Sequence, residues 1–417
     1  MSGPDRPLLP IDEAFAAYGE RLTALPAEER PLEEARGRVL ARTVASDIDL
    51  PPFPQSAMDG YALRAADTAG ASPSEPAELS LVGTRPAGPP DGSLGVGAGE
   101  AARIFTGARL PEGADAVLRQ EDAGVREGTL RVARPLEEGT AVRSRGEEIR
   151  RGTTLAEAGT RLTAGHAGGL AVAGVDRVRV RRPPRVRLFV TGDEVVETGA
   201  ELGPGEVHDA NTPLVSAWLD ARGVALADAD HLPDDLEATR DALAEALEAS
   251  DLVLTTGGVS VGDRDFVLDA AERAGVEEVF WRVRQKPGKP LFFGLLDGTP
   301  LLGLPGNPGS VHACLVTHVR RVLDLLEGAA DPGPRMRPGR LAADFRLNPH
   351  REWWARCRVR VDGDGEVWLE PLGRQASHMI AELGRAEAVA RLPRGEDELE
   401  RGARVRWAPA AAWEAAG

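Results

Sequence analysis

The chain has 417 residues, 42% of them hydrophobic, and a formal net charge of −16. Since single hydrophobic cores stop growing at about 250 to 300 residues, this length predicts two to four domains. The negative charge disfavours a nucleic-acid partner, although screening over about 8 Å in physiological salt leaves room for a local basic pocket that binds an anion. Two cysteines cannot form a disulfide framework and no Cys-x-x-Cys pair is present to hold zinc, so we expect a protein of the reducing cytoplasm. No apolar run approaches the ~18 residues that a membrane span needs, so no membrane partner is expected either.

The first part of the chain reads as irregular and mostly β. Residues 10–25 and 31–43 carry the pattern of two short helices. Between about residues 47 and 145, short apolar stretches alternate with Gly and Pro at intervals that favour an all-β subdomain. A helical pattern over 163–175 then leads to Pro183-Pro184, which we take as a domain boundary.

From residue 183 to about 330 the pattern changes to alternating strands and helices. Strands are expected at 185–194, 251–258 and 299–304, and helices at 211–223, 234–250, 263–276 and after the turn that follows residue 304. Asn211 or Thr212 is expected to cap the first of these helices, and Gly223 to end it. This alternation predicts a mainly parallel sheet covered by helices on both faces, with ligands bound at the carboxyl ends of its strands.

A small β domain is expected to close the chain. Residues 351–361 and 366–372 alternate apolar and polar side chains around an Asp-Gly turn, which is typical of a hairpin. The predicted fold class is therefore multidomain α+β and α/β. It comprises an N-terminal region (1–182), a three-layer α/β domain (183–330) and a C-terminal β domain (331–417).

Three strand ends of the α/β part place glycine beside hydroxyl, amide or acid groups, at Val190–Glu194, Thr255–Asp265 and Gly303–Ser310. Glycine lets the backbone approach a ligand and direct N–H groups at a phosphate. None of the three is a Walker A loop or a Gly-x-Gly-x-x-Gly fingerprint, and each alone is most simply a tight strand-to-helix turn. Three in one sheet favour a nucleotide-like or phosphorylated ligand.

Carboxylates suited to a hard cation occur at these loops, namely Asp193, Glu194, Asp263 and Asp265. Mg²⁺ prefers oxygen ligands and often combines one or two carboxylates with substrate phosphates and water. Each acid taken singly is more often a solvated charge, so their position carries the argument. The sparse histidines have no zinc-hydrolase spacing, and the sequence Val-Thr-Gly-Asp-Glu is no esterase elbow.

Lys286 and Lys289 are the two lysines of a chain with 50 basic residues, and they lie three positions apart around Pro-Gly. An ammonium is a compact charge with three rotating donors, whereas a guanidinium is a planar fork. A small tetrahedral oxyanion in a tight pocket would favour the ammonium. At about 4 Å and an effective dielectric near 20, each lysine offers about 4 kcal/mol of attraction to one charge before desolvation. The alternative is a solvated, proline-rich turn.

With these segments in order, the chain resembles the MoeA-type molybdopterin molybdenumtransferases, which are related to the E domain of gephyrin. The matching stretches span residues 51–310 and read PPFPQSAMDGYALRAAD, IFTGARLPEGADAVLRQED, RSRGEEIRRG, VTGDEVVETG, HDANTPLV, TTGGVSVGDRD, KPGKP and GLPGNPGS. The resemblance implies an enzyme of molybdenum cofactor synthesis that takes adenylylated molybdopterin and molybdate, inserts the metal, and releases AMP with the help of Mg²⁺. It also implies a homodimer whose cleft combines the N-terminal part of one subunit with the α/β domain of the other.

The resemblance also assigns site residues. Asp59 and Thr106 would come from the N-terminal part, and Glu194 and Asp265 would hold the metal, with Gly192, Asp193, Gly257, Gly258 and Ser260 at the nucleotide. Lys286, Lys289, Ser310, Arg351 and Ser377 would form the molybdate pocket, whose turn is shaped by Pro305, Gly306, Asn307 and Pro308. Asp234 matches a further catalytic acid, although Asp230 and Asp235 compete for that alignment.

One departure and two alternatives complete the expectations. The family usually has Gly-Glu-Asp where this chain reads Gly146-Glu147-Glu148, which leaves the role of Glu148 open. The α/β part also resembles molybdopterin adenylyltransferase, but the long flanking regions argue against that activity, so a separate adenylyltransferase is expected as the upstream partner. A gephyrin-like scaffold without catalysis is the second alternative.

Overall fold

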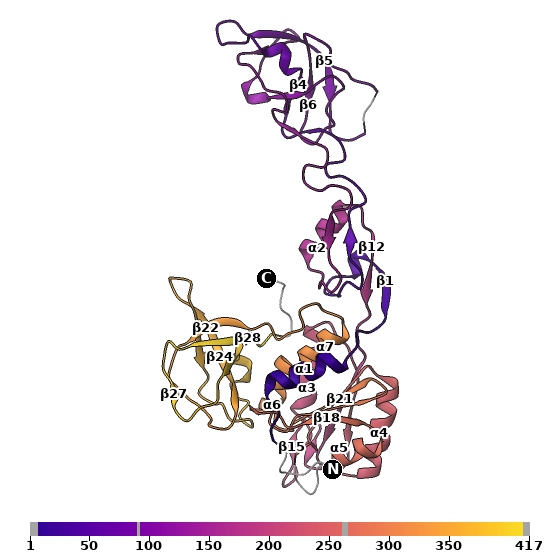
Figure 1. Ribbon diagram of the computed structural model, residues 1–417, viewed down its shortest axis with the longest axis vertical. Coiled ribbons are helices and arrows are strands. Elements are labelled where there is room, and N and C mark those ends of the chain that lie inside the picture. Colours follow the sequence, from indigo (N-terminus) through magenta and orange to yellow (C-terminus); the bar gives the residue numbers. More distant parts are fainter. Residues whose placement is uncertain (1–6, 90–91, 261–265, 412–417) are drawn as a thin grey trace. The chain divides into compact units, whose positions relative to one another are not determined.

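The structure is a computed structural model that describes residues 7–89, 92–260 and 266–411. The chain divides into two compact units (Figure 1). The smaller unit comprises Thr43–Glu157 and Ala164–Arg177, and the larger one comprises the rest, including the short return segment Ala158–Thr163. Each unit is described by itself.

The smaller unit is built on a six-stranded sheet with the order β7-β4-β6-β5-β9-β8. Its strands are β4 (Gly60–Leu63), β5 (Ala77–Arg85), β6 (Glu100–Ile104), β7 (Ala116–Arg119), β8 (Gly124–Arg126) and β9 (Thr129–Val132). All pairs are antiparallel except β5 with β6. Short ladders join β2 (Val44–Ala45) to β11 (Thr154–Ala156) and β3 (Gln55–Ser56) to β10 (Val142–Arg143), and helix α2 spans Ala164–Val172. The predicted β subdomain and the helix within 163–175 are confirmed.

The helix expected at 31–43 is wrong. The chain forms β1 (Ala27–Pro31), which pairs with β12 (Arg177–Arg181), and then a single 3-10 turn, η1 (Leu32–Glu34). Gly37 follows with φ +78°, after which Val39 and Leu40 are buried and bridge to distant segments. Tertiary pairing therefore overrides the local helical pattern.

The larger unit contains the predicted α/β sheet, in the order β16-β13-β17-β21-β20-β18. Its strands are β13 (Val186–Thr191), β16 (Leu226–Leu232), β17 (Leu252–Thr256), β18 (Glu277–Trp281), β20 (Phe292–Leu296) and β21 (Thr299–Leu304). The four strands from β16 to β21 are parallel, and β20 and β18 are antiparallel. The mainly parallel sheet is confirmed.

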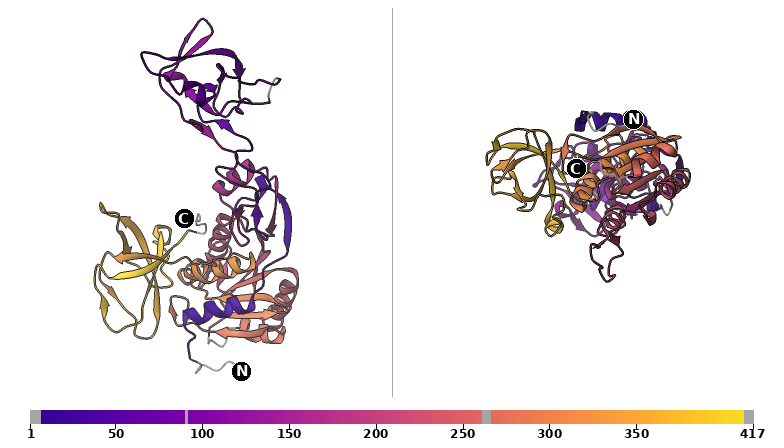
Figure 2. Two further views of the ribbon diagram at one scale, coloured as in Figure 1. Left: turned by 45° about the horizontal axis from the view of Figure 1, so that its top comes forward. Right: turned by 90° about the horizontal axis from the view of Figure 1, so that it is seen from below.

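Helices cover both faces of this sheet (Figures 1 and 2). Alternate residues of β13 divide between two cores: Leu188 and Val190 pack on one face, Phe189 on the other. The first face is covered by α1 (Ile11–Arg21), α3 (Asn211–Ala221) and a continuous helix made of α6 (Pro308–Cys314), a π-helical segment η4 (Leu315–Val319) and α7 (Arg320–Leu326). The second is covered by α4 (Leu236–Ala249) and α5 (Phe266–Arg273).

The cap expected for α3 is wrong, because a residue upstream of Asn211 and Thr212 supplies it. The Asp209 carboxylate accepts hydrogen bonds from the backbone N–H groups of Asn211 (2.8 Å) and Thr212 (3.0 Å). The Asn211 side chain is thereby left for another use. The helix ends before Gly223, whose φ is +76°.

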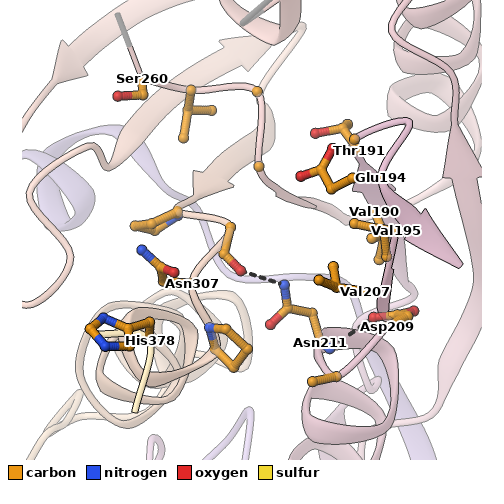
Figure 3. Close-up of a pocket in the computed structure, with 18 of the residues that line it drawn as sticks. Val190, Thr191, Glu194, Val195, Val207, Asp209, Asn211, Ser260, Asn307 and His378 are labelled. Atoms are coloured by element: carbon orange, nitrogen blue, oxygen red, sulfur yellow. Dashed lines mark hydrogen bonds between the residues drawn. The ribbon is translucent and has the colours of Figure 1, made fainter. Parts of the chain in front are cut away.

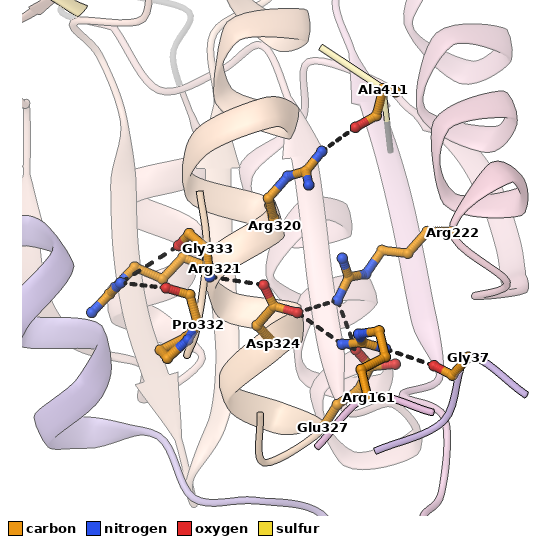
Figure 4. A network of polar contacts seen from close by, with 10 residues as sticks. All are labelled: Gly37, Arg161, Arg222, Arg320, Arg321, Asp324, Glu327, Pro332, Gly333 and Ala411. Carbon is orange, nitrogen blue, oxygen red and sulfur yellow. Dashed lines mark hydrogen bonds and ion pairs between the residues drawn. The ribbon is translucent and has the colours of Figure 1, made fainter. Parts of the chain in front are cut away.

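A buried ion network fastens the end of α7 (Figure 4). Arg222 Nη2 lies 2.6 Å from Asp324 Oδ1 and 2.7 Å from Glu327 Oε2, and Arg161 Nη2 contacts the same two oxygens at 2.8 and 2.6 Å. Arg161 also donates to the Gly37 carbonyl oxygen at 2.8 Å. The return segment is thus tied to the α/β core by charge.

The C-terminal domain is a closed β-barrel within the larger unit. Its strands are β22 (Arg337–Leu341), β24 (Glu352–Val361), β25 (Val367–Pro371), β26 (Ala388–Leu392) and β28 (Arg404–Pro409), and pairing of β24 with β26 closes the ring. The predicted hairpin is confirmed in β24 and β25, where Asp362 Oδ1 accepts from the N–H groups of Asp364 and Glu366. A two-residue strand from the α/β part, β19 (Gln285–Lys286), pairs in parallel with the start of β24. The barrel and the lysine segment therefore share a sheet.

Across the described ranges, none of the helices combines the length and the hydrophobicity that a membrane crossing requires.

Candidate functional site

A cavity of about 780 Å³ opens at the carboxyl ends of β13, β17 and β21 (Figure 3). The three glycine-bearing loops that the sequence singled out therefore meet at one place. Predicted site residues that line the cavity are Gly192, Glu194, Asp234, Gly257, Gly258, Ser260, Pro305, Gly306, Asn307 and Pro308. The cavity is of the size that binding sites for small molecules usually have.

Glycine is required by geometry in the loop after β17. Gly257 and Gly258 have φ of +91° and +67°, in the left-handed region. A Cβ at Gly257 would lie 2.6 Å from Thr191 Oγ1, and one at Gly258 would lie 2.4 Å from Val267 Cγ2. The backbone itself therefore forms this wall, where a ligand can approach closely.

Asn211 is a lining residue that sequence reasoning did not assign. It is buried at the start of α3, and its Nδ2 donates to the Gly306 carbonyl oxygen at 2.8 Å (Figure 3). Its Oδ1 is buried without a hydrogen-bond partner in the described structure. The stretch HDANTPLV is one of the family-like motifs, but we expected Asn211 to be a helix cap and therefore assigned its side chain no role at the site.

The three competing acids, one within β16 and two directly after it, have different surroundings. Asp230 Oδ2 pairs with Arg187 Nη2 at 2.9 Å, and Asp235 caps α4 by accepting from the Ala238 N–H at 2.8 Å. Asp234 lines the cavity. Of the three, Asp234 is therefore the one at the candidate site.

The other predicted acids are Asp193, Asp263 and Asp265. Asp193 is not among the lining residues, and its Oδ1 accepts from the Asp234 backbone N–H at 3.1 Å, so it holds the loop instead. Asp263 and Asp265 belong to residues 261–265, which lie outside the described part of the chain. Within the part that is described, no group of three or more His, Cys, Asp or Glu side chains could hold a metal.

The barrel domain contributes to the cavity through the loop around Ser377. His378 and Ile380 line the cavity, and Ser377 accepts from Asn307 Nδ2 at 3.3 Å (Oγ) and from the Gly309 N–H at 2.9 Å (carbonyl oxygen). Ser310 lies in α6, where it is buried and does not line the cavity. Ser377, which the resemblance assigns to the molybdate pocket, therefore contacts the turn at Asn307.

Arg356 is a second residue that sequence reasoning missed. Its guanidinium is buried, and Nη2 donates to the carbonyl oxygens of Arg374 (2.6 Å) and Ala376 (3.0 Å). A Cβ at Gly309 would lie only 2.5 Å from Arg356 Nη1. Arg356 thus supports the loop that carries Ser377, and its place in an alternating strand gave no signal for this.

Lys286, Lys289 and Arg351 form a cationic group beside the cavity. Burial and the charge of Arg351 lower the pKa of both lysines, and Arg282 lowers that of Lys289 further. Lys286 Nζ lies 4.0 Å from the centre of the Trp353 ring. Neither lysine lines the cavity, but Pro290, adjacent to Lys289, does. Each lysine is pushed towards losing its proton, a tendency that a bound anion would reverse.

The smaller unit contains two of the predicted site residues, Asp59 and Thr106. Asp59 Oδ1 accepts from the Thr106 N–H and from its hydroxyl, both at 2.8 Å, and these bonds lower the pKa of Asp59. A separate cavity of about 550 Å³ in this unit is lined by Glu147 and Glu148 among others. Glu147 Oε2 accepts from the Ser144 N–H at 2.8 Å, so Glu147 holds the turn.

Comparisons with known proteins agree along the whole chain. Three family models match in order: the MoeA N-terminal region (domains I and II) at residues 9–174, a probable molybdopterin-binding domain at 188–325, and the MoeA C-terminal region (domain IV) at 338–410. A Staphylococcus epidermidis molybdopterin molybdenumtransferase is 32% identical over 87% of this chain and 86% of its own length. The chain belongs to the molybdopterin molybdenumtransferase family.

Other members of this family extend the likeness. A Staphylococcus aureus molybdopterin molybdenumtransferase is 29% identical over 94% of each chain. Two solved structures of a molybdopterin biosynthesis MoeA protein from Pyrococcus horikoshii have TM-scores of 0.82 and 0.83 at 29% and 27% identity, covering 97% and 96% of this chain and all of theirs. The predicted resemblance and fold class are confirmed, and the protein is an enzyme of molybdenum cofactor biosynthesis. The adenylyltransferase and scaffold alternatives are not favoured.

Proposed function

We propose that this molybdopterin molybdenumtransferase inserts molybdate into adenylylated molybdopterin and releases AMP. The observation that carries the proposal is the adjacency of two features. A cavity of nucleotide size lies at three glycine-bearing strand ends, and Pro290 in its wall adjoins a group of three cations. A substrate with a nucleotide at one end and an oxyanion acceptor at the other would need both.

The adenylylated substrate would bind along the glycine backbone of the cavity. Gly257 and Gly258 present main chain without side chains, and Asn211 supplies an unused carbonyl oxygen that a ligand N–H or hydroxyl can donate to. Asp234 also lines this space. We expect these groups to orient the pyrophosphate, because fixed donors and acceptors lower the cost of reaching a reactive arrangement.

Molybdate, the second substrate, would bind at Lys286, Lys289 and Arg351, and the family resemblance adds Ser310 and Ser377 to this pocket. Burial, together with the charge of Arg351, lowers the pKa of both lysines, and a tetrahedral dianion would favour their charged forms. Bond breaking at the phosphate by an oxygen of molybdate or water needs no protein nucleophile. The chain's contribution is then position and charge.

Mg²⁺ is part of the proposal. Glu194 lines the cavity with Asp234 nearby, whereas the described ranges contain no cluster of three potential ligands. This sparse set fits an ion that takes one or two carboxylates and completes its shell with water and substrate phosphates. We expect Glu194 to be a ligand and, on the sequence alone, Asp265. When bound, the ion supplies neutralisation of charge on the phosphate oxygens.

A homodimer is also proposed, in which Asp59 and Thr106 of one subunit complete the site of the other. It can be tested by mixing two inactive variants, Asp59→Ala and Lys289→Ala, under conditions that exchange subunits. Recovery of AMP release in the mixture would support shared sites, and a mixture as inactive as its parts would count against them.

We also propose that a separate adenylyltransferase makes the substrate and that the protein is cytoplasmic. A reducing cytoplasm would suit its two buried free thiols.

The deciding experiment incubates the protein with adenylylated molybdopterin, Mg²⁺ and molybdate. AMP release that depends on molybdate is the expected result. Consumption of ATP together with molybdopterin would instead favour adenylylation, and AMP release that ignores molybdate would contradict the proposed insertion step.

A further inference from the structure

Gln285 immediately precedes the first lysine and is fully buried on β19. Both ends of its amide form hydrogen bonds. Nε2 donates to the Gly288 carbonyl oxygen at 2.9 Å, and Oε1 accepts from Trp354 Nε1 at 2.9 Å and contacts His318 Nε2 at 2.9 Å. The Gly288 carbonyl belongs to the turn between Lys286 and Lys289. The buried Gln285 side chain is therefore hydrogen-bonded to the backbone between the two lysines.

The partners fix which way this amide points. The Trp354 indole N–H can only donate and the Gly288 carbonyl can only accept, so oxygen must face Trp354 and nitrogen must face Gly288. His318 then carries its proton on Nε2, and the Tyr18 hydroxyl, 3.1 Å from Nδ1, donates to the other nitrogen. Burial lowers the pKa of His318 to about 3, which keeps the ring neutral in this arrangement.

The turn has little room to move around this contact. Gly288 has φ +90°, and a Cβ there would lie 2.8 Å from Gln285 Nε2 and 2.9 Å from Cys314 Sγ. The backbone N–H of Val283 donates to the Lys289 carbonyl oxygen at 2.9 Å, which ties the far end of the turn. The lysine turn is thus anchored to α1, η4 and β24 through neutral groups that are buried.

We propose that Gln285 is a positioning residue that holds the backbone of the turn between Lys286 and Lys289 and thereby places both ammonium groups for a tetrahedral oxyanion. Burial disfavours the charge of both lysines and Arg351 repels each of them, which together lower the pKa of both. Without an anchor, the turn would move so that the cations lie further apart. Anion binding would then have to bring the turn back to its original conformation. Holding the turn in advance removes that cost from the binding step. The inference rests on the proposed function only in naming the oxyanion as molybdate.

The test replaces Gln285 by Met, which has a similar length and cannot form the three hydrogen bonds. We expect the KM for molybdate, and its Kd measured by calorimetry with molybdate alone, to rise about tenfold while kcat changes less than threefold. Gln285→Glu is the second variant. It keeps the acceptor for Trp354 and His318 but sets an oxygen against the Gly288 carbonyl, so molybdate binding should weaken similarly even if the Met variant does not fold.

The matched control is Thr317→Val. Thr317 is fully buried in η4 beside His318, and its hydroxyl donates to the Ala313 carbonyl oxygen at 2.7 Å without touching the lysine turn. We expect it to lose stability and keep the wild-type Kd for molybdate. A folded Gln285 variant with wild-type Kd and KM for molybdate would overturn the inference and leave the proposed function standing. Weakened molybdate binding in a protein that never releases AMP would instead sink the proposed function and support the positioning role.

Discussion

The Asp59 carboxylate accepts both hydrogen-bond donors of Thr106, although 47 residues separate them in the chain. The β4–β6 pairing, which sets Gly60 opposite Ile104, brings the two together. The lowered pKa of Asp59 comes mainly from these two bonds, with a smaller contribution from the charge of Arg103, whereas burial acts in the opposite direction. The pair is thus held in a fixed geometry with the carboxylate ionised.

Replacing Thr106 by Val should raise the pKa of Asp59 towards its ordinary value, because the hydroxyl donor is lost while the backbone donor stays. Carbon-detected NMR titration of the carboxyl group measures this. Since the folded-state pKa is depressed, the pair's contribution to stability is present at neutral pH and is lost as pH falls through that pKa. Thr140→Val, which removes a hydroxyl bonded to the Glu137 carbonyl, is the control and should leave Asp59 unchanged.

Lys289→Arg tests whether a compact charge is needed at the lysine turn. The variant keeps the positive charge, but a planar guanidinium presents its donors in a different geometry. We expect molybdate-dependent AMP release to fall at least about tenfold while the melting temperature stays close to that of the wild type. Arg360→Lys, at an exposed pair with Glu370, is the reverse exchange and should have no effect. A wild-type rate in Lys289→Arg would refute the argument from charge shape.

Mutation to Asn should distinguish the roles of Asp230, Asp234 and Asp235 in activity and stability. Asp234→Asn is expected to lower AMP release and leave stability unchanged, because this acid lines the cavity. Asp235→Asn weakens the cap on the Ala238 N–H and should cost up to about 1 kcal/mol of unfolding free energy with little loss of activity. Asp230→Asn removes a partly exposed pair with Arg187, worth about 1 kcal/mol or less. Urea unfolding and AMP assays on all three variants check this, and activity loss confined to Asp230 or Asp235 would contradict it.

Arg222→Met should destabilise the larger unit by about 3 to 5 kcal/mol, because it leaves Asp324 and Glu327 buried with one fewer cation. Urea unfolding at neutral pH gives the value. The pKa of Asp324 is lowered despite its burial, through Arg222 and Arg161. The network's stabilisation is therefore lost as pH falls through that depressed pKa, and the gap between wild type and variant should narrow in acid. A gap that stays constant with pH would contradict this assignment.

The sequence was sufficient for the α/β sheet and the hairpin because both rest on short-range periodicity that burial enforces. The 31–43 segment was misread because the partners of Val39 and Leu40 lie more than 100 residues away, in contacts that no local pattern records. At the site, the glycine loops were predictable because their glycines directly follow predicted strands. The role of Asn211 was not predictable. Its position at the start of a helix suggested a cap, but Asp209 supplies that cap instead. The supports Gln285 and Arg356 gave no signal, since only the fold brings their partners near.

The pairing of β19 with β24 means that Lys286 belongs to two domains at once. Its strand neighbour is Trp353 of the barrel, while residues a few positions further on enter the α/β sheet at β20. The barrel is therefore joined to the α/β domain by β-sheet pairing as well as by the chain connection. Removing it would leave the α/β core its own hydrophobic clusters but would deprive Lys286 of Trp353, which is both its strand partner and its aromatic contact. The proposed oxyanion site therefore requires both domains.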